Sequence, residues 1–135
     1  MRPGNKLTVV ATSQAVIDTL NACTKYNLDV ELIDPRTLKP LDEELILNSV
    51  RKTGRLLVVD YDAPFGGFAA EVSALVSEKA LPHLKAPVQR MTFPDCPMAA
   101  SQILERTFYP NPDSIAARIN NILDGKHPEI ATAEA

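Results

Sequence analysis

The sequence lacks most of the patterns that mark a reactive centre. Its two cysteines, Cys23 and Cys96, lie far apart and outside any CxxC pair, so we expect neither a disulfide framework nor a zinc site. Its five glycines form neither a GxGxxG nor a Walker motif, and no serine lies in a GxSxG context. His83 and His127 have no nucleophile or carboxylate partner close in the sequence. No complete active site is therefore expected.

Basic clusters and long apolar runs are also missing. The formal charge is −3 and the pI is near 5.3, so we expect no nucleic-acid partner. No apolar run approaches the roughly 20 residues that a membrane-spanning helix needs. Residues 1–6 are not followed by the apolar core of a signal peptide. We expect a soluble intracellular domain with reduced cysteines and no membrane partner.

What the sequence does contain is an alternation of short apolar runs with amphipathic segments. We expect strands at residues 7–11, 30–33, 56–60 and 88–93. We expect helices at 14–26, 41–52, from the glycine pair to residue 80, and from 113 to 125, with one further turn near 101–107. This order predicts an α/β fold in which helices cover both faces of a mostly parallel sheet. We expect one domain over residues 1–125 and a polar tail at 126–135.

Two details of the helices can be compared directly with a structure. Thr12 and Ser13 offer hydroxyl groups that could cap the first helix, and Asp113 could cap the last. In the first helix, Val16, Leu20 and Cys23 recur at helical spacing, and Ile17 joins them. We expect these four side chains to face the core.

The carboxyl ends of the parallel strands would form one edge of the sheet, where open α/β folds bind ligands. Polar residues follow the expected strands there: Thr12, Ser13, Asp34, Arg36, Asp60, Asp62 and Asp95. The acidic residues could form a magnesium site or could start turns, and we favour turns because no ligand spacing singles out a cation. A phospho-acceptor receiver domain is excluded, because the first strand ends in threonine and serine instead of the required acidic pair.

Gly66 and Gly67 lie between the third strand and its helix. Free backbone N–H groups at this helix start could bind an anion weakly. The pair could also form a tight corner where Phe65 and Phe68 flank a close backbone contact, with Phe68 beneath the corner. We favour the corner.

Several motifs together resemble one known family. They are IDPRTLKPLD at 33–42, TGR at 53–55, GGF at 66–68 with Glu71, and the spaced pairs Pro94-Asp95, Pro97-Met98, Leu104-Glu105 and Tyr109-Pro110. From residue 6 to residue 123, the sequence resembles the C-terminal domain of the β subunit of 2-oxo acid dehydrogenases. These are the thiamine-diphosphate-dependent, decarboxylating components of the pyruvate and branched-chain complexes. The loop at 61–65 departs from the family in having no basic residue, and residues 99–100 depart in being alanines.

The resemblance implies a three-layer α/β/α fold with strand order 2-1-3-4. In the family an antiparallel edge strand precedes the first parallel strand and ends near Arg-Pro-Gly. This sequence begins at Met1-Arg2-Pro3-Gly4, so we expect the edge strand to be missing and residues 30–33 to form an open edge. An open edge favours pairing with another chain, and we therefore expect a homodimer.

The resemblance also implies an assembly role without catalysis by this chain alone. In the family, thiamine diphosphate and magnesium lie outside this region, so no catalytic, cofactor or metal residue is assigned. The implied partners are the α subunit, the rest of the β subunit and, in some complexes, the lipoyl acyltransferase core. The expected location is cytoplasmic, or the mitochondrial matrix or a plastid in a eukaryote. The candidate interface residues are Asp34, Arg36, Phe65, Gly66, Gly67, Phe68 and Asp95.

Two alternatives remain at this point. The chain could be the equivalent domain of a transketolase or a deoxyxylulose-phosphate synthase, although the Pro-Asp-Cys-Pro-Met segment at 94–98 favours the oxo-acid dehydrogenases. It could also be a free-standing module that binds an anion or a protein partner.

Overall fold

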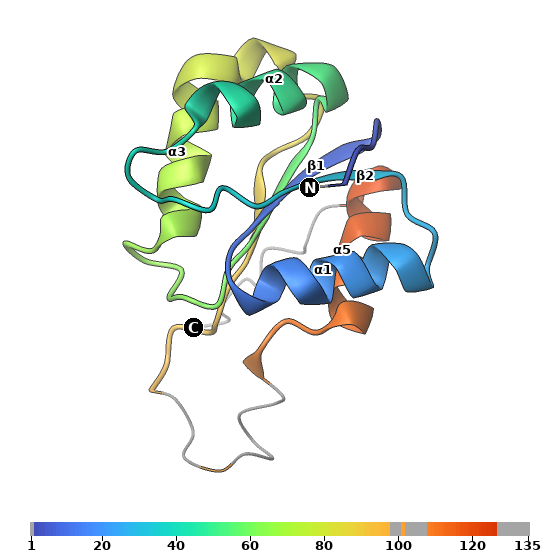
Figure 1. The fold of residues 1–135 in the computed structure, drawn as a ribbon, viewed down its shortest axis with the longest axis vertical. Coiled ribbons are helices and arrows are strands. Elements are labelled where there is room, and N and C mark those ends of the chain that lie inside the picture. The colour runs from blue at the N-terminus through green and yellow to red at the C-terminus, as the bar shows by residue number, and fades with distance from the viewer. Residues whose placement is uncertain (1, 98–100, 102–107, 127–135) are drawn as a thin grey trace, which may run out of the picture.

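The computed structural model describes residues 2–97, 101 and 108–126. Four parallel strands form one sheet in the order β2-β1-β3-β4 (Figure 1). The strands are β1 (Leu7–Ala11), β2 (Val30–Ile33), β3 (Leu56–Val59) and β4 (Gln89–Met91). The predicted fold class and strand order are confirmed. Most of the predicted turn near 101–107 and most of the polar tail lie outside the described residues.

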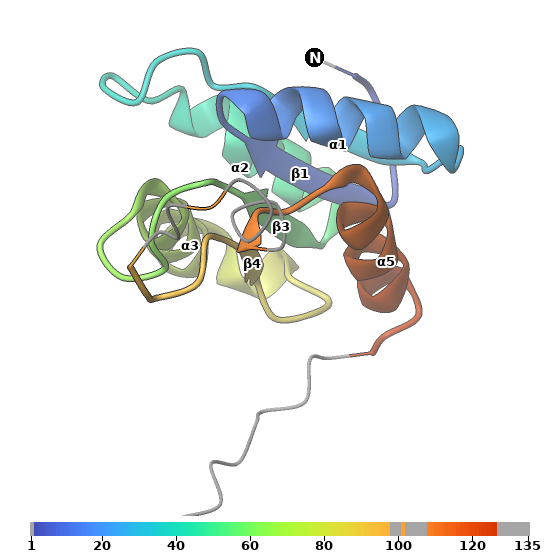
Figure 2. The ribbon, with the colours of Figure 1, turned by 90° about the horizontal axis from the view of Figure 1, so that it is seen from below.

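Helices cover both faces of the sheet (Figures 1 and 2). On one face lie α1 (Gln14–Lys25) and α5 (Pro112–Leu123), and on the other lie α2 (Glu43–Thr53) and α3 (Phe68–Ala80). A short 3-10 turn, η1 (Leu81–His83), follows α3. The two layers enclose separate apolar cores, and β1 contributes to both with all five of its residues buried.

Sequence signals at the helix ends are only partly confirmed. Gly54 ends α2 in a left-handed conformation with φ 75°, which a residue without a Cβ adopts freely. The N-cap of α5 lies two residues earlier than predicted, because Asn111 forms a capping box with Ser114. Asp113 is therefore not its cap. Ser13 precedes α1 but makes no capping hydrogen bond through its side chain.

The predicted apolar face of α1 is confirmed for Cys23, partly confirmed for Val16, and wrong for Ile17 and Leu20. The buried residues are Ala15, Thr19, Ala22 and Cys23, and Val16 is only partly buried. Ile17 and Leu20 are 52% and 44% exposed. α1 turns its small side chains inward, which lets it pack closely against the sheet and α5. A prediction based on hydrophobicity alone assigns burial to the larger residues of the neighbouring face, Ile17 and Leu20, instead.

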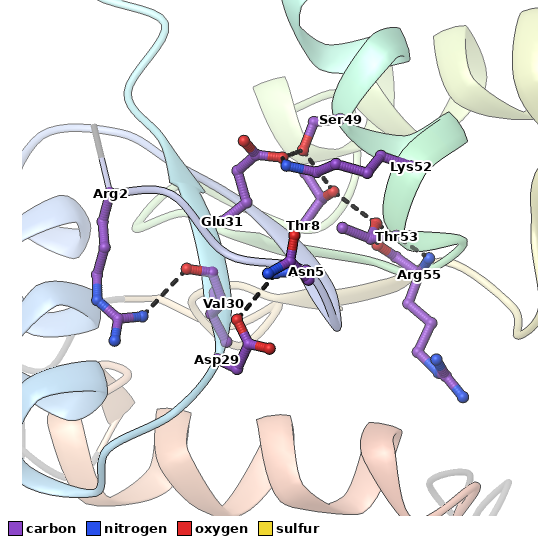
Figure 3. Close-up of polar contacts among 10 residues, drawn as sticks. All are labelled: Arg2, Asn5, Thr8, Asp29, Val30, Glu31, Ser49, Lys52, Thr53 and Arg55. Atoms are coloured by element: carbon purple, nitrogen blue, oxygen red, sulfur yellow. Dashed lines mark hydrogen bonds and ion pairs between the residues drawn. The ribbon is translucent and has the colours of Figure 1, made fainter.

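The β2 edge is not fully open, which corrects the prediction made for residues 30–33. The Arg2 N–H donates to the Leu32 carbonyl at 3.2 Å, and the Leu32 N–H donates to the Arg2 carbonyl at 2.9 Å, an isolated antiparallel bridge. The Arg2 guanidinium also donates to the Val30 carbonyl (Figure 3). A Cβ at Gly4 would lie 2.1 Å from the Val30 carbonyl carbon, so glycine permits this close approach. The N-terminal segment thus covers part of this edge.

A chain of buried hydroxyl groups joins β1 to α2 at the opposite end of the sheet from the strand carboxyl ends (Figure 3). Thr8 Oγ1 lies 2.7 Å from Ser49 Oγ and 2.8 Å from Thr53 Oγ1. Ser49 donates to the Glu31 carboxylate, which also pairs with Lys52 at 2.7 Å. Since a carboxylate only accepts, Ser49 donates its proton to Glu31 and therefore accepts from Thr8. The Thr53 hydroxyl lies within hydrogen-bond distance of both Thr8 Oγ1 and the Arg55 carbonyl oxygen. The chain satisfies every hydroxyl that this interface buries.

We predict that Thr8→Val lowers the free energy of unfolding by about 1 to 2 kcal/mol, because valine keeps the shape but removes both hydrogen bonds of Thr8. Urea denaturation of the purified chain measures the change. Thr24→Val is the matched control, because Thr24 is exposed on α1 and its replacement is expected to change stability by no more than about 0.5 kcal/mol. Equal effects of the two substitutions would show that the buried chain contributes little.

Candidate functional site

The carboxyl edge of the sheet was the expected site, and the structure separates its predicted residues into independent local contacts. Asp34 accepts from the Arg36 backbone N–H at 3.1 Å and pairs with the Arg36 guanidinium at 3.0 Å. Asp62 accepts from the Ala63 N–H at 2.7 Å. Asp95 is exposed. These contacts are those of turn-forming residues, in agreement with the favoured interpretation.

Asp60 is the exception, because it is the buried acid of this edge, only 6% exposed. Its Oδ1 accepts from the Thr12 hydroxyl at 2.8 Å, which ties the end of β3 to the end of β1. Its Oδ2 has no hydrogen-bond partner. No group of three His, Cys, Asp or Glu side chains in the described part of the chain could hold a metal ion. Among the described residues, Asp60 therefore belongs to no cluster of cation ligands.

Ser13 occupies a strained backbone conformation between β1 and α1, with φ 50° and ψ −130°. This region is populated almost only by glycine, and other residues adopt it at a cost of about 1 to 3 kcal/mol. Exposed serines in such strand-to-helix turns can act as nucleophiles when a base lies beside them. Among the described residues, the Ser13 side chain makes no hydrogen bond to a histidine or a carboxylate that could activate it.

The glycine pair forms a tight corner before α3. A Cβ at Gly67 would lie 2.4 Å from the Ala63 carbonyl oxygen, whereas Gly66 has open space and φ 71°. Glu71 occupies the first turn of α3, where its negative charge opposes a bound anion. These observations favour the corner over an anion site. Phe68 is half-buried against the α2–α3 core, and not fully beneath the corner as predicted.

Sequence reasoning missed an aromatic group that lies across this edge. The Tyr61 ring lies 4.7 Å from that of Tyr109, and Phe93 contacts both Tyr109 and Phe108. The Tyr61 hydroxyl donates to the Asp18 carboxylate and also lies 3.0 Å from the Pro110 carbonyl. Burial, followed by the hydrogen bond to Asp18, raises the pKa of Tyr61. No local motif predicts this group, because its members are brought together only by the fold.

A groove runs between the loop that precedes α2 and the side of α3, with a volume of about 560 Å³. We call it the α3 groove. Its apolar lining comes from Leu38, Leu41, Phe68 and Leu75. Leu38 is 58% exposed, and Phe65, at the corner beside α3, is 89% exposed. Large apolar side chains exposed at one edge are typical of a surface that contacts another protein.

None of the helices in the described part of the chain has the length and apolar character needed to cross a membrane. What the described residues do present is the α3 groove with the exposed Leu38 and, beside it, the exposed Phe65. Comparison with known proteins then decides the family. The model of the transketolase C-terminal domain matches residues 1–115. The chain belongs to this family.

Relatives of this transketolase C-terminal domain include β subunits of several dehydrogenases. It is 37% identical over 119 residues to the acetoin:2,6-dichlorophenolindophenol oxidoreductase subunit beta of Bacillus subtilis, covering 86% of this chain and 35% of the relative. It is 37% identical to the 2-oxoisovalerate dehydrogenase subunit beta of Pseudomonas aeruginosa, covering 92% and 35%. It is 42% identical to the mitochondrial pyruvate dehydrogenase E1 component subunit beta of Chaetomium thermophilum, covering 81% and 30%. The chain thus spans about a third of the length of these relatives.

One solved structure agrees with the fold. A chain described as a split gene transketolase in an inactive beta4 tetramer matches with a TM-score of 0.76 at 22% identity, covering 93% of this chain and 41% of that one. At this identity the match supports the fold of the transketolase C-terminal domain and nothing further.

We predict that Ser13→Gly raises the free energy of unfolding by about 1 kcal/mol, because glycine removes the strain at φ 50°. Thermal or urea denaturation measures the gain. Ser77→Gly is the matched control: Ser77 is exposed within α3, and glycine there is expected to cost about 0.5 kcal/mol. A loss of stability at both positions would contradict the strained conformation.

Proposed function

We propose that the chain serves as the C-terminal domain of the β subunit of a thiamine-diphosphate-dependent dehydrogenase that decarboxylates pyruvate or branched-chain 2-oxo acids and transfers the acyl group to a lipoyl group. The observation that carries the proposal is the family match over residues 1–115 combined with relatives that are β subunits about three times as long. Acetoin joins the candidate substrates, because one relative is named for it.

In this proposal the chain assembles the enzyme and does not itself catalyse. Thiamine diphosphate and magnesium would be held by the α subunit and the remaining part of the β subunit, as the family resemblance implies. This domain would contact those parts and a second β subunit. Docking of the lipoyl acyltransferase core is a further role for the same surface.

The proposed interface lies at the carboxyl edge. It consists of Asp34, Arg36, Phe65, Gly66, Gly67, Phe68 and Asp95, together with Leu38, which the sequence did not single out. The loop that carries Asp34 and Arg36 is held by their own ion pair, so it can present Leu38 without support from a core. The Gly66–Gly67 corner does the same for Phe65. Both apolar side chains would become buried on assembly, which favours association by removing apolar area from water.

A transketolase or deoxyxylulose-phosphate synthase is the alternative within the superfamily. The split gene transketolase supports it only at the level of the fold, whereas the sequence relatives named above are oxo-acid and acetoin dehydrogenase subunits. The proposal therefore follows the sequence relatives.

We predict that the chain alone is inactive and that activity appears on mixing. The partners are the α subunit and a β subunit shortened by its C-terminal third, both from the Pseudomonas aeruginosa relative. Dye reduction with thiamine diphosphate, magnesium and pyruvate, a branched-chain oxo acid or acetoin measures the reaction. Turnover by the chain alone would contradict the proposal. So would the absence of both turnover and a complex in analytical ultracentrifugation after mixing.

We predict that Leu38→Ser combined with Phe65→Ser weakens association in this mixture by about tenfold or more, because two exposed apolar contacts are lost. Leu81→Ser is the matched control, since Leu81 is 60% exposed but lies beyond the C-terminal end of α3. Circular dichroism checks that all variants keep their fold. Equal loss in the control would place the interface elsewhere.

A further inference from the structure

β4 forms the second edge of the sheet, and no described residue pairs with its outer side. The Met91 carbonyl and the Phe93 N–H both bond to the chain just after β3, at 2.9 and 3.1 Å. Alternate residues of a strand direct their backbone groups to opposite sides, so those of Arg90 and Thr92 face away from β3. Unpaired N–H and C=O groups therefore line this edge, the arrangement that accepts an additional strand.

Two adjoining hollows follow this edge, with volumes of about 280 and 370 Å³. We call them together the β4 groove. The lining shared by both consists of Pro64, Arg90, Thr92 and Arg118. Its lining comes from β4 and the residues beside it, from the loop that carries Pro64, and from the start and middle of α5. It is separate from the α3 groove, with which it shares no lining residue.

The β4 groove is lined by two arginines, and the described residues bring no acid to it. The Arg118 guanidinium, on α5, donates to the Gln89 side-chain oxygen at 3.2 Å. The Arg90 guanidinium, on β4, donates to the Pro64 carbonyl at 2.7 Å. Neither arginine has an acidic partner among the described residues, and no acidic residue lines either hollow. The chain as a whole has 17 acidic and 14 basic residues and is net negative, so the groove is positive where the protein overall is negative.

One further side chain of β4 carries a donor without an acceptor. Gln89 is 6% exposed, its oxygen is used by Arg118, and its Nε2 has no acceptor among the described residues. A buried donor without an acceptor is unfavourable, and a ligand that brings an oxygen can supply the missing acceptor. Backbone N–H groups, two guanidinium groups and this amide therefore all favour an oxygen-rich, anionic occupant.

We propose that the β4 groove binds an extended acidic segment of a partner protein, which pairs with β4 as an additional strand. Neighbouring side chains of a strand point to opposite faces of the sheet. Two adjacent acidic residues would therefore place one carboxylate beside Arg118 and the other beside Arg90. This inference goes beyond the proposed function and does not depend on it.

The test uses the purified chain and four fluorescein-labelled hexapeptides in fluorescence anisotropy at low salt. The first is Thr-Val-Glu-Asp-Val-Thr, the second replaces the acids by Gln-Asn, and the third and fourth carry N-methyl groups on the odd and on the even residues. Removing the charges is expected to weaken binding by about tenfold or more, and so is N-methylation of the one set of residues whose N–H groups face β4. If both N-methylated peptides bind as tightly as the first peptide, the groove binds carboxylates without adding a strand and the proposal is wrong.

Variants of the chain test the two arginines. Arg90→Gln and Arg118→Gln are each expected to weaken binding of the acidic peptide by about tenfold. Arg51→Gln is the control, because Arg51 lies on α2, outside the groove. A similar loss in all three would show non-specific attraction and overturn the proposal, as would failure of the first peptide to bind the unaltered chain.

Residues 127–135 contain Glu129 and Glu134 and are a competing occupant. A chain shortened after Lys126 is expected to bind the acidic peptide with unchanged affinity. A gain of tenfold or more would assign the groove to the chain's own tail and overturn the assignment to a partner.

Discussion

The fold depends on the burial of β1 from both faces. β1 pairs with β2 on one side and β3 on the other, and its alternate residues contribute to the two separate cores. Every one of its positions must therefore be apolar or hydrogen-bonded inside the protein. Thr8 is the polar residue among them, and the hydroxyl chain through Ser49 and Thr53 to Glu31 satisfies it. The same hydrogen bonds hold α2 against the sheet. The need to satisfy the Thr8 hydroxyl therefore positions the α2 layer relative to the sheet.

The buried strand leaves the edges of the sheet as the places where side chains reach solvent. Helices cover both faces, and the core layer of α1 and α5 includes Cys23, whose thiol pKa is raised mainly by burial. At the carboxyl edge the turn contacts of Asp34 and Asp62 are local, so the loops can carry Leu38 and Phe65 into solvent without disturbing the cores. Leu38 and Phe65 can therefore be exposed for contact with a partner without weakening the cores. This property agrees with the proposed role of the domain in assembling a larger enzyme.

The sequence predicted the fold more fully than the site, for a physical reason. Strand and helix patterns are local, and Leu7–Ala11 and Val30–Ile33 were located to the residue. Burial on α1 was missed because Ala15 and Ala22 are buried for their small size, which hydrophobic periodicity does not register. The Asn111 cap lay one residue before a proline and could have been read from that pair. Contacts such as Tyr61 with Asp18 join residues 43 apart, and only the fold brings them together.

The two edges of the sheet differ in how their open backbone groups are treated. Arg2 and Gly4 cover β2 with one antiparallel bridge and a close backbone approach. β4 is short and has a charged residue on its edge, which are features that discourage non-specific pairing between copies of a chain. Two like-charged arginines in the β4 groove add to this, because a second copy would bring the same positive charge to the contact. Arg90 and Arg118 would therefore both repel a second copy of the chain and attract an acidic strand. Backbone pairing alone would accept either partner equally, so the charge of these arginines would decide between them.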